Sequence, residues 1–228
     1  MKISTLVILC VIILIVLSGS AYYYLNYVVS GNSNKAAVDI TPTTEKRILA
    51  FGDSLTYGYG LATVDDSYPS QLQNKLTENE YNYKVINFGI SGETTGDALL
   101  RLPAALSYTP DIVLLEFGAN DFLQSKSPEE AQENLEKIIK SFDDKNIKVI
   151  LLNVEQNPLL PLPNKDRFSQ IMPDLAKKYG LQIVTSFLDG ILLNPNLTIE
   201  DRVHPNKIGY AKALSDNLWP ILKKELVK

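Results

Sequence analysis

A serine at the end of a short apolar run is the first group in this sequence that could do chemistry. Ser54 lies in Gly52-Asp53-Ser54-Leu55, directly after the apolar residues 48–51. The run is typical of a buried strand, and Gly52 permits a sharp turn at its end. Ligands bind at the carboxyl ends of strands in open α/β sheets, so a serine there can be a nucleophile if a base reaches it. Taken alone, Asp53 and Ser54 could equally be turn or helix N-cap residues.

The sequence contains a single histidine, His204, and Asp201 precedes it on the same segment. Acyl transfer by a serine needs a base, an acid that orients the base, and hydrogen-bond donors for the oxyanion. His204 offers the imidazole, and Asp201 is close enough in the chain to hold it in one tautomer. We therefore predict Ser54, Asp201 and His204 as the catalytic residues. The alternative is that Asp201 caps the closing helix and His204 lies on a surface loop.

Two further polar segments, 87–92 and 118–121, follow predicted strands. We predict that the oxyanion donors are the backbone N–H groups of Ser54 and Gly89 and the side-chain amide of Asn120. Gly89 suits this task because a backbone without Cβ can approach a substrate closely. Each segment by itself could be a simple loop or an Asx turn. Their joint occurrence, each at the end of a strand, favours a functional site.

Strand-like and helix-like segments alternate along the rest of the chain. The predicted strands are 47–51, 83–88, 111–117, 148–154 and 181–184. The predicted helices are 67–79, 94–106, 127–144, 166–179 and 206–226, and Pro173 lies inside the fourth. This alternation predicts an α/β fold, a three-layer α/β/α sandwich with a five-stranded parallel sheet that is flavodoxin-like in strand order.

The N-terminal segment is long and uncharged after Lys2. An apolar run from Leu6 to Leu17 continues through several tyrosines to residue 29, and a bilayer needs roughly 20 such residues. We predict an N-terminal hydrophobic helix over residues 1–29 that anchors the protein in a membrane, a polar linker over 30–44 and a folded domain over 45–228. A signal segment cleaved near Ala21 is the alternative. In either case the domain is expected outside the cytoplasm: membrane-anchored in the periplasm or at the cell surface, or secreted.

Composition excludes several classes of protein. The formal net charge is −4, from 22 Lys and Arg against 26 Asp and Glu, so no positive surplus favours binding to nucleic acid. Cys10 is the only cysteine, which excludes an intrachain disulfide. A single histidine and a single cysteine also exclude a multi-histidine or cysteine-based zinc site.

The four polar segments together resemble the signature blocks of the SGNH hydrolases, also called GDSL esterases and lipases. The resemblance covers residues 47–226. Tyr68-Pro69, Ile90–Thr94 and Arg101-Leu102-Pro103 are most similar to the bacterial lysophospholipase, acyl-thioesterase and arylesterase branch. One departure is Arg202, which stands where relatives of this branch usually carry glycine.

The resemblance implies the SGNH hydrolase fold and an enzyme without a metal or organic cofactor. It also implies that Ser54 is the nucleophile, that Gly89 and Asn120 are oxyanion donors, and that Asp201 and His204 complete the triad. We expect hydrolysis of carboxylic esters or thioesters, on a small-molecule or lipid substrate with a fatty or aryl acyl group, through an acyl-enzyme on Ser54.

The segment after the fourth predicted strand is rich in leucine and proline. We predict that Leu159, Leu160 and Leu162 bind the acyl chain; a rigid surface loop is the alternative. Two other functions stay open. One is a carbohydrate O-acetylesterase, which would need a more polar site. The other is a membrane-tethered binding domain without turnover, which would have no need for the complete set of catalytic groups.

Overall fold

The computed structural model describes residues 45–154 and 164–228, which belong to one compact unit, Thr44–Lys228. The predicted N-terminal helix and linker, and the leucines at 159, 160 and 162, lie outside the described residues. Within the described part, no helix combines the length and apolar character that crossing a bilayer requires.

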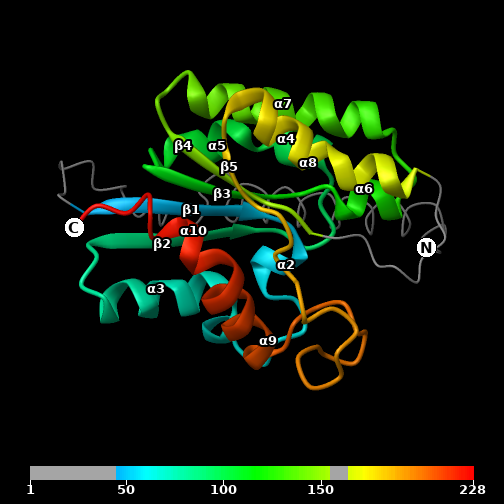
Figure 1. Cartoon of the computed structure of the whole chain (residues 1–228). Coiled ribbons are helices and arrows are strands. Elements are labelled where there is room, and N and C mark those ends of the chain that lie inside the picture. The colour runs from blue at the N-terminus through cyan, green and yellow to red at the C-terminus, as the bar shows by residue number, and fades with distance from the viewer. Residues whose placement is uncertain (1–44, 155–163) are drawn as a thin grey trace, which may run out of the picture. The chain divides into compact units, whose positions relative to one another are not determined.

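A five-stranded parallel sheet forms the centre of the fold (Figure 1). Its strands are β1 (Lys46–Gly52), β2 (Tyr83–Gly89), β3 (Ile112–Glu116), β4 (Lys148–Leu152) and β5 (Gln182–Val184). They lie in the order β2-β1-β3-β4-β5, so the predicted flavodoxin-like order is confirmed. The central strands β1 and β3 are almost fully buried because helices cover both faces of the sheet.

Helices pack on both faces and complete the predicted three layers (Figure 1). One face carries α4 (Thr95–Leu100), α5 (Leu102–Ser107), α7 (Pro128–Asp143) and α8 (Lys165–Tyr179). The other face carries α3 (Tyr68–Glu78), α9 (Lys207–Lys212) and α10 (Trp219–Leu222). Side chains alternate across a strand, so β1 sends Leu49 and Phe51 into the first core and Ile48 and Ala50 into the second.

Two predicted helices differ from the structure. The segment 94–106 forms two short helices, α4 and α5. Pro103 has no N–H to donate to the carbonyl four residues earlier, and its ring would clash with that carbonyl in a continuous helix. The closing segment is helical from Lys207 to Leu222, but its middle part, Ala213–Leu218, is π-helical. In contrast, Pro173 lies inside α8 without ending it.

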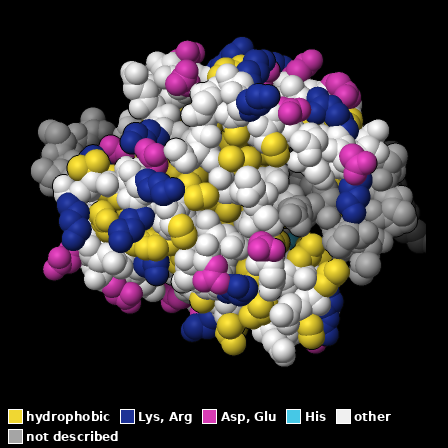
Figure 2. All heavy atoms as spheres, viewed as in Figure 1, with side chains coloured by type: hydrophobic (Ala, Val, Ile, Leu, Met, Phe, Trp, Pro, Cys, Tyr) yellow, Lys and Arg dark blue, Asp and Glu magenta, His cyan; other side chains and the backbone are white. Residues whose placement is uncertain are grey.

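The register of the sheet determines which residues meet at its carboxyl edge. Gly52, at the end of β1, is paired with Gly89 of β2 on one side and with Glu116 of β3 on the other. The segments after these strands, each predicted to carry functional groups, therefore start side by side. On the face shown in Figure 2, positive and negative side chains are interspersed.

Candidate active site

The turn between β1 and the short helix α2 (Ser54–Tyr57) presents Ser54 at the carboxyl edge of the sheet. Asp53 is the N-cap of α2, and its carboxylate accepts the N–H of Leu55 at 3.1 Å. Gly52 is needed here for space. A Cβ at this position would lie 2.0 Å from Thr56 Oγ1 and 2.6 Å from Glu116 Oε2. The sharp turn therefore depends on close packing between β1, α2 and β3.

Ser54, His204 and Asp201 form a continuous hydrogen-bond chain. Ser54 Oγ lies 2.8 Å from His204 Nε2, and His204 Nδ1 lies 2.6 Å from Asp201 Oδ2. The other oxygen of Asp201, Oδ1, accepts the backbone N–H groups of Val203 and His204, both at 2.9 Å. Partial burial raises the pKa of Asp201, but these hydrogen bonds outweigh it and leave the pKa below its ordinary value.

The segment that carries His204 is fixed by contacts with distant parts of the chain. Tyr210 of α9 is buried, and its hydroxyl donates to the carbonyl of Leu55 in α2 at 2.9 Å. Asn206 caps α9 through its side chain, which accepts the N–H groups of Ile208 and Gly209 at 3.0 Å. The contact of Tyr210 in α9 with α2 thus helps to bring His204 beside Ser54.

Arg202 adopts a backbone conformation that explains the departure noted in the sequence. Its φ is +63°, in the left-handed region that favours glycine. Its N–H donates to the carbonyl of Ile199, and its carbonyl accepts the N–H of Leu193. The side chain is exposed. The loop therefore keeps its shape with arginine at the cost of some backbone strain.

The predicted oxyanion donors differ in whether their N–H groups already have a hydrogen-bond acceptor. Among the described residues, no acceptor takes the N–H of Ser54. The N–H of Gly89 donates to Asn87 Oδ1 at 3.0 Å. A Cβ at Gly89 would lie 2.2 Å from the backbone nitrogen of Tyr57, so the structure gives this glycine a packing role against α2.

Asn120 lies at the carboxyl edge as predicted, in the short helix α6 (Ala119–Leu123) that follows β3. Its side-chain nitrogen donates to Asp53 Oδ2 at 3.0 Å and to the carbonyl of Glu93 at 2.9 Å. The contact with the Glu93 carbonyl brings the segment that follows β2, in which Gly92 directly precedes Glu93, next to the amide of Asn120. Gly92 has φ +86°, and nothing lies within 4 Å of the place a Cβ would take. This exposed backbone beside Asn120 is a candidate that the sequence prediction missed.

Arg101 connects three of the segments at the carboxyl edge. Its guanidinium donates to the carbonyls of Gly52 and Phe88, at the ends of β1 and β2, at 3.1 and 2.8 Å. It also forms an ion pair with Glu93 at 2.6 Å. The guanidinium carbon lies over two aromatic rings, 4.4 Å from the centre of Phe88 and 4.7 Å from the centre of Phe51. In the sequence Arg101 was only part of a family motif, and nothing local signals these contacts.

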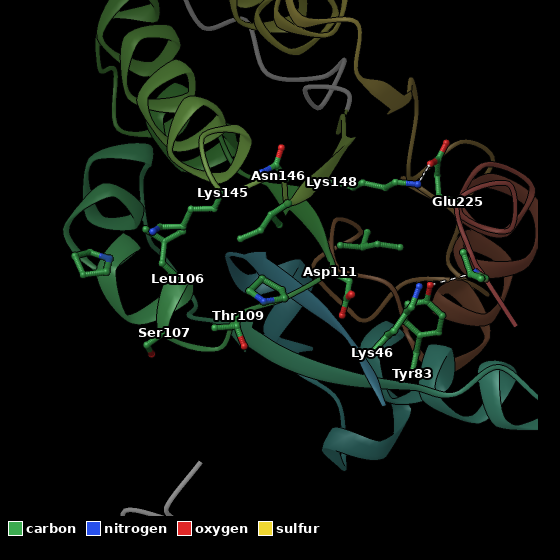
Figure 3. A pocket seen from close by; sticks show the side chains of 15 residues that line it. Lys46, Tyr83, Leu106, Ser107, Thr109, Asp111, Lys145, Asn146, Lys148 and Glu225 are labelled. Carbon is green, nitrogen blue, oxygen red and sulfur yellow. Dashed lines mark hydrogen bonds and ion pairs between the residues drawn. The ribbon is translucent and has the colours of Figure 1, made fainter. Parts of the chain in front are cut away.

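A cavity of about 810 Å³ lies at the opposite edge of the sheet (Figure 3). Its lining includes the first residues of four strands: Lys46, Tyr83, Ile112 and Lys148. The cavity therefore lies at the amino ends of the strands, whereas Ser54 lies at the carboxyl end of β1, where ligands of open α/β sheets bind. The cavity is separate from the site around Ser54. Among the described residues, no group of three or more His, Cys, Asp and Glu side chains could hold a metal ion.

Known proteins of one family match this chain. The sequence model of the GDSL-like Lipase/Acylhydrolase family matches residues 50–212. An arylesterase of Vibrio mimicus is 37% identical over 161 residues, which cover 70% of this chain and 80% of the relative. The thioesterase 1/protease 1/lysophospholipase L1 of Escherichia coli K12 is 30% identical over 70% of this chain and 76% of its own length. The crystal structure of TesA superposes with a TM-score of 0.74 at 30% identity, over 78% of this chain and 99% of TesA. The chain therefore belongs to the GDSL-like lipase/acylhydrolase family.

Proposed function

We propose that this protein hydrolyses carboxylic esters or thioesters of fatty or aryl acyl groups through an acyl-enzyme on Ser54. The observation that carries the proposal is the chain from Ser54 Oγ to His204 Nε2 at 2.8 Å and from His204 Nδ1 to Asp201 at 2.6 Å. A half-buried serine hydroxyl that contacts an imidazole, which is itself held by a carboxylate, is an activated nucleophile.

The reaction follows from this geometry in two halves. Ser54 Oγ forms a bond to the acyl carbon while its proton passes to His204 Nε2, and the carbonyl oxygen becomes an oxyanion. His204 then gives the proton to the leaving alcohol or thiol as the bond to the acyl carbon breaks. Water attacks the acyl-enzyme with His204 as the base, and Ser54 leaves with the proton returned. Asp201 holds the imidazole and stabilises its charged form.

The oxyanion would be held by the N–H of Ser54, the amide of Asn120 and one further backbone N–H. We propose that Gly92 supplies it, because Gly89 already donates to Asn87 and packs against α2. Both hydrogens of the Asn120 amide have acceptors in the structure, Asp53 and the Glu93 carbonyl. A negatively charged oxygen accepts a hydrogen bond more strongly than a carbonyl does. The oxyanion would therefore replace the Glu93 carbonyl as an acceptor of the Asn120 amide, while Asp53 keeps its hydrogen bond to the same amide.

Apolar side chains near the site favour an apolar acyl or aryl group over a sugar. Tyr59 lies against His204, with ring centres 4.9 Å apart, and is 47% exposed. Ile90 follows the end of β2 and Leu123 follows Asn120 in α6; they are 46% and 52% exposed. Large exposed apolar side chains on three segments near Ser54 suit a substrate whose apolar acyl or aryl group is buried against them. The contribution of Leu159, Leu160 and Leu162 stays a prediction from sequence.

A hydrolysis panel on the purified protein tests the proposal. It compares nitrophenyl acetate, nitrophenyl esters with longer acyl chains, lysophospholipid, acyl-CoA and acetylated sugars, each with Ser54→Ala as the control. Hydrolysis of the acyl or aryl substrates that Ser54→Ala abolishes is the expected result. Preference for acetylated sugars would instead indicate a carbohydrate O-acetylesterase. Binding without turnover on every substrate would indicate a non-catalytic domain.

We also propose that residues 1–29 anchor the protein in a membrane, with the enzyme domain outside the cytoplasm. The support is the uncharged N-terminal run alone. Membrane fractionation followed by N-terminal sequencing tests it. A soluble product that begins near Ala21 would show that the segment is a cleaved signal.

A further inference from the structure

Glu116 is a buried acid that the proposed reaction does not use. It is the last residue of β3 and is paired in the sheet with Gly52, one residue from Asp53. Its side chain is 1% exposed, and among the described residues no Lys or Arg forms an ion pair with it. A buried carboxylate without a cation is costly, so its surroundings need an explanation.

The two oxygens of Glu116 have different partners. Oε2 accepts the N–H of Asp53 at 3.3 Å and the hydroxyl of Thr56 at 3.1 Å. Because the Thr56 hydrogen is used there, the nearby Tyr68 hydroxyl, 3.3 Å away, must donate to Thr56. Oε1 has no hydrogen-bond donor among the described residues. An oxygen in this position is satisfied if it carries a proton and donates it.

Asp53 is the acceptor that such a proton requires. Its Oδ1 accepts Leu55 N at 3.1 Å and lies 3.4 Å from Ser54 Oγ, and its Oδ2 accepts the amide of Asn120 at 3.0 Å. Glu116 Oε2 already accepts the N–H of Asp53, so the two buried side chains lie next to each other, and each carboxyl group affects the pKa of the other. Burial raises the pKa of Asp53 to about 6, and burial together with the charge of Asp53 raises the pKa of Glu116 well above its ordinary value. Burial and mutual repulsion therefore both favour a single proton held by these two adjacent acids.

Resting on the function proposed above, we propose that Glu116 is a positioning residue that keeps its proton in the working enzyme. By donating a hydrogen bond from Oε1, it holds the Asp53 carboxylate in place as the acceptor that orients the amide of Asn120 toward the oxyanion. The resulting chain of donors runs from Tyr68 through Thr56 and Glu116 to Asp53, which receives Asn120 from the other side.

Loss of the Glu116 proton would place two negatively charged carboxylates, Glu116 and Asp53, next to each other in a buried site. The other titratable groups around the pair are Tyr68 on α3, Tyr210 on α9 and His204 on its loop, of which only the imidazole can carry a positive charge. Repulsion between the two carboxylates would therefore displace the Asp53 side chain, and the acceptor of Asn120 would move with it.

The first experiment measures the proton directly, without activity. Urea unfolding of the full-length wild type and Glu116→Gln is compared between pH 7.0 and 8.5. Folded wild type holds the Glu116 proton and the unfolded chain releases it, so its stability falls as pH rises. The unfolding equilibrium constant of wild type should rise about tenfold per pH unit relative to Glu116→Gln. Parallel pH dependence of the two proteins would mean that Glu116 is ionised when folded and would overturn the proposal.

The second experiment measures positioning through kcat. Glutamine keeps the acceptor for Asp53 N–H and supplies a donor to the Asp53 carboxylate, so Glu116→Gln should keep kcat within about threefold of wild type. Glu116→Leu has no donor and should lower kcat by about 30-fold or more with KM little changed. In the Asn120→Ala background, Glu116→Leu should cost less than about threefold, because the donor it positions is gone.

The outcomes separate this inference from the proposed function. Absence of Ser54-dependent hydrolysis in wild type would refute the function, while the unfolding comparison still decides whether Glu116 holds a proton. If wild type is active, a 100-fold loss in Glu116→Gln overturns the inference. Equal effects of Glu116→Leu with and without Asn120 overturn it too. If Glu116→Leu does not fold, Glu116→Gln decides by both of its readouts.

Discussion

Replacing Asp201 by asparagine is expected to reverse the tautomer of His204. In the structure Asp201 Oδ1 accepts the N–H groups of Val203 and His204, and Oδ2 faces His204 Nδ1. An asparagine at this position keeps its oxygen on the two backbone donors, because those N–H groups need an acceptor. Its NH₂ group must then face Nδ1. The imidazole would carry its hydrogen on Nε2 and present a donor, instead of an acceptor, to Ser54.

The size of the effect follows from losing the base. Ser54 cannot pass its proton to a nitrogen that already carries one, so kcat should fall by about 10⁴-fold, which corresponds to about 5 kcal/mol of activation free energy. KM should change by less than about threefold, because Asp201 contacts the ring nitrogen of His204 that is opposite the one facing Ser54. Stability should hold, since asparagine has the same shape, keeps the two hydrogen bonds from the backbone and reverses the direction of the third.

The assay for this prediction uses the single histidine of the chain. In protein labelled with ¹⁵N-histidine, the imidazole signals belong to His204 alone and report which nitrogen carries the hydrogen. We expect hydrogen on Nδ1 in wild type and on Nε2 in Asp201→Asn, in parallel with kcat measurements. The Ser54→Ala/Asp201→Asn double variant should be little worse than Ser54→Ala, because these residues act as one unit. An unchanged tautomer, or a kcat above a tenth of wild type, would refute the reasoning.

Three further substitutions test the site. Ser54→Ala should remove nearly all hydrolysis, leaving a rate of roughly a thousand-fold over water from the oxyanion donors; substantial activity, with contaminating hydrolases excluded, would contradict the nucleophile assignment. Asn120→Ala should lower kcat by about 10²- to 10³-fold at constant KM, whereas a raised KM with normal kcat would show that Asn120 binds substrate. Arg202→Gly relieves a left-handed arginine that costs about 1 kcal/mol, partly offset by the greater freedom of glycine in the unfolded chain. Urea unfolding should therefore show a stability within about 1 kcal/mol of wild type, and a loss of more than about 2 kcal/mol would show that the Arg202 side chain holds the loop.

Much of this protein was predictable from short-range patterns in the sequence. Apolar runs and turn residues repeat over a few positions, so the alternation of strands and helices indicated the parallel sheet and its flavodoxin-like order. Residues at strand ends must meet at one edge of such a sheet. With one histidine available, the partner of Ser54 could be identified before any contact was known.

The tertiary structure decided everything that depends on contacts between distant segments. Gly52 is required by Thr56 and Glu116 packing against it, and Gly89 by the backbone of α2. Nothing near Arg101 in the sequence indicates that it holds Gly52, 49 residues away.

The same limit applies to the oxyanion donors and the buried acids. The amide of Asn120 is held by Asp53, 67 residues earlier, and Glu116 lies 63 residues beyond the same Asp53. The register of β1 with β3 creates these contacts, and a shift of one residue in this pairing would abolish them. Local propensity determines which segments become strands and turns, whereas register and packing determine which of their polar groups meet. The sequence by itself therefore predicted Ser54, Asp201 and His204 as the candidate reacting groups, and only the folded chain determined which residues position them.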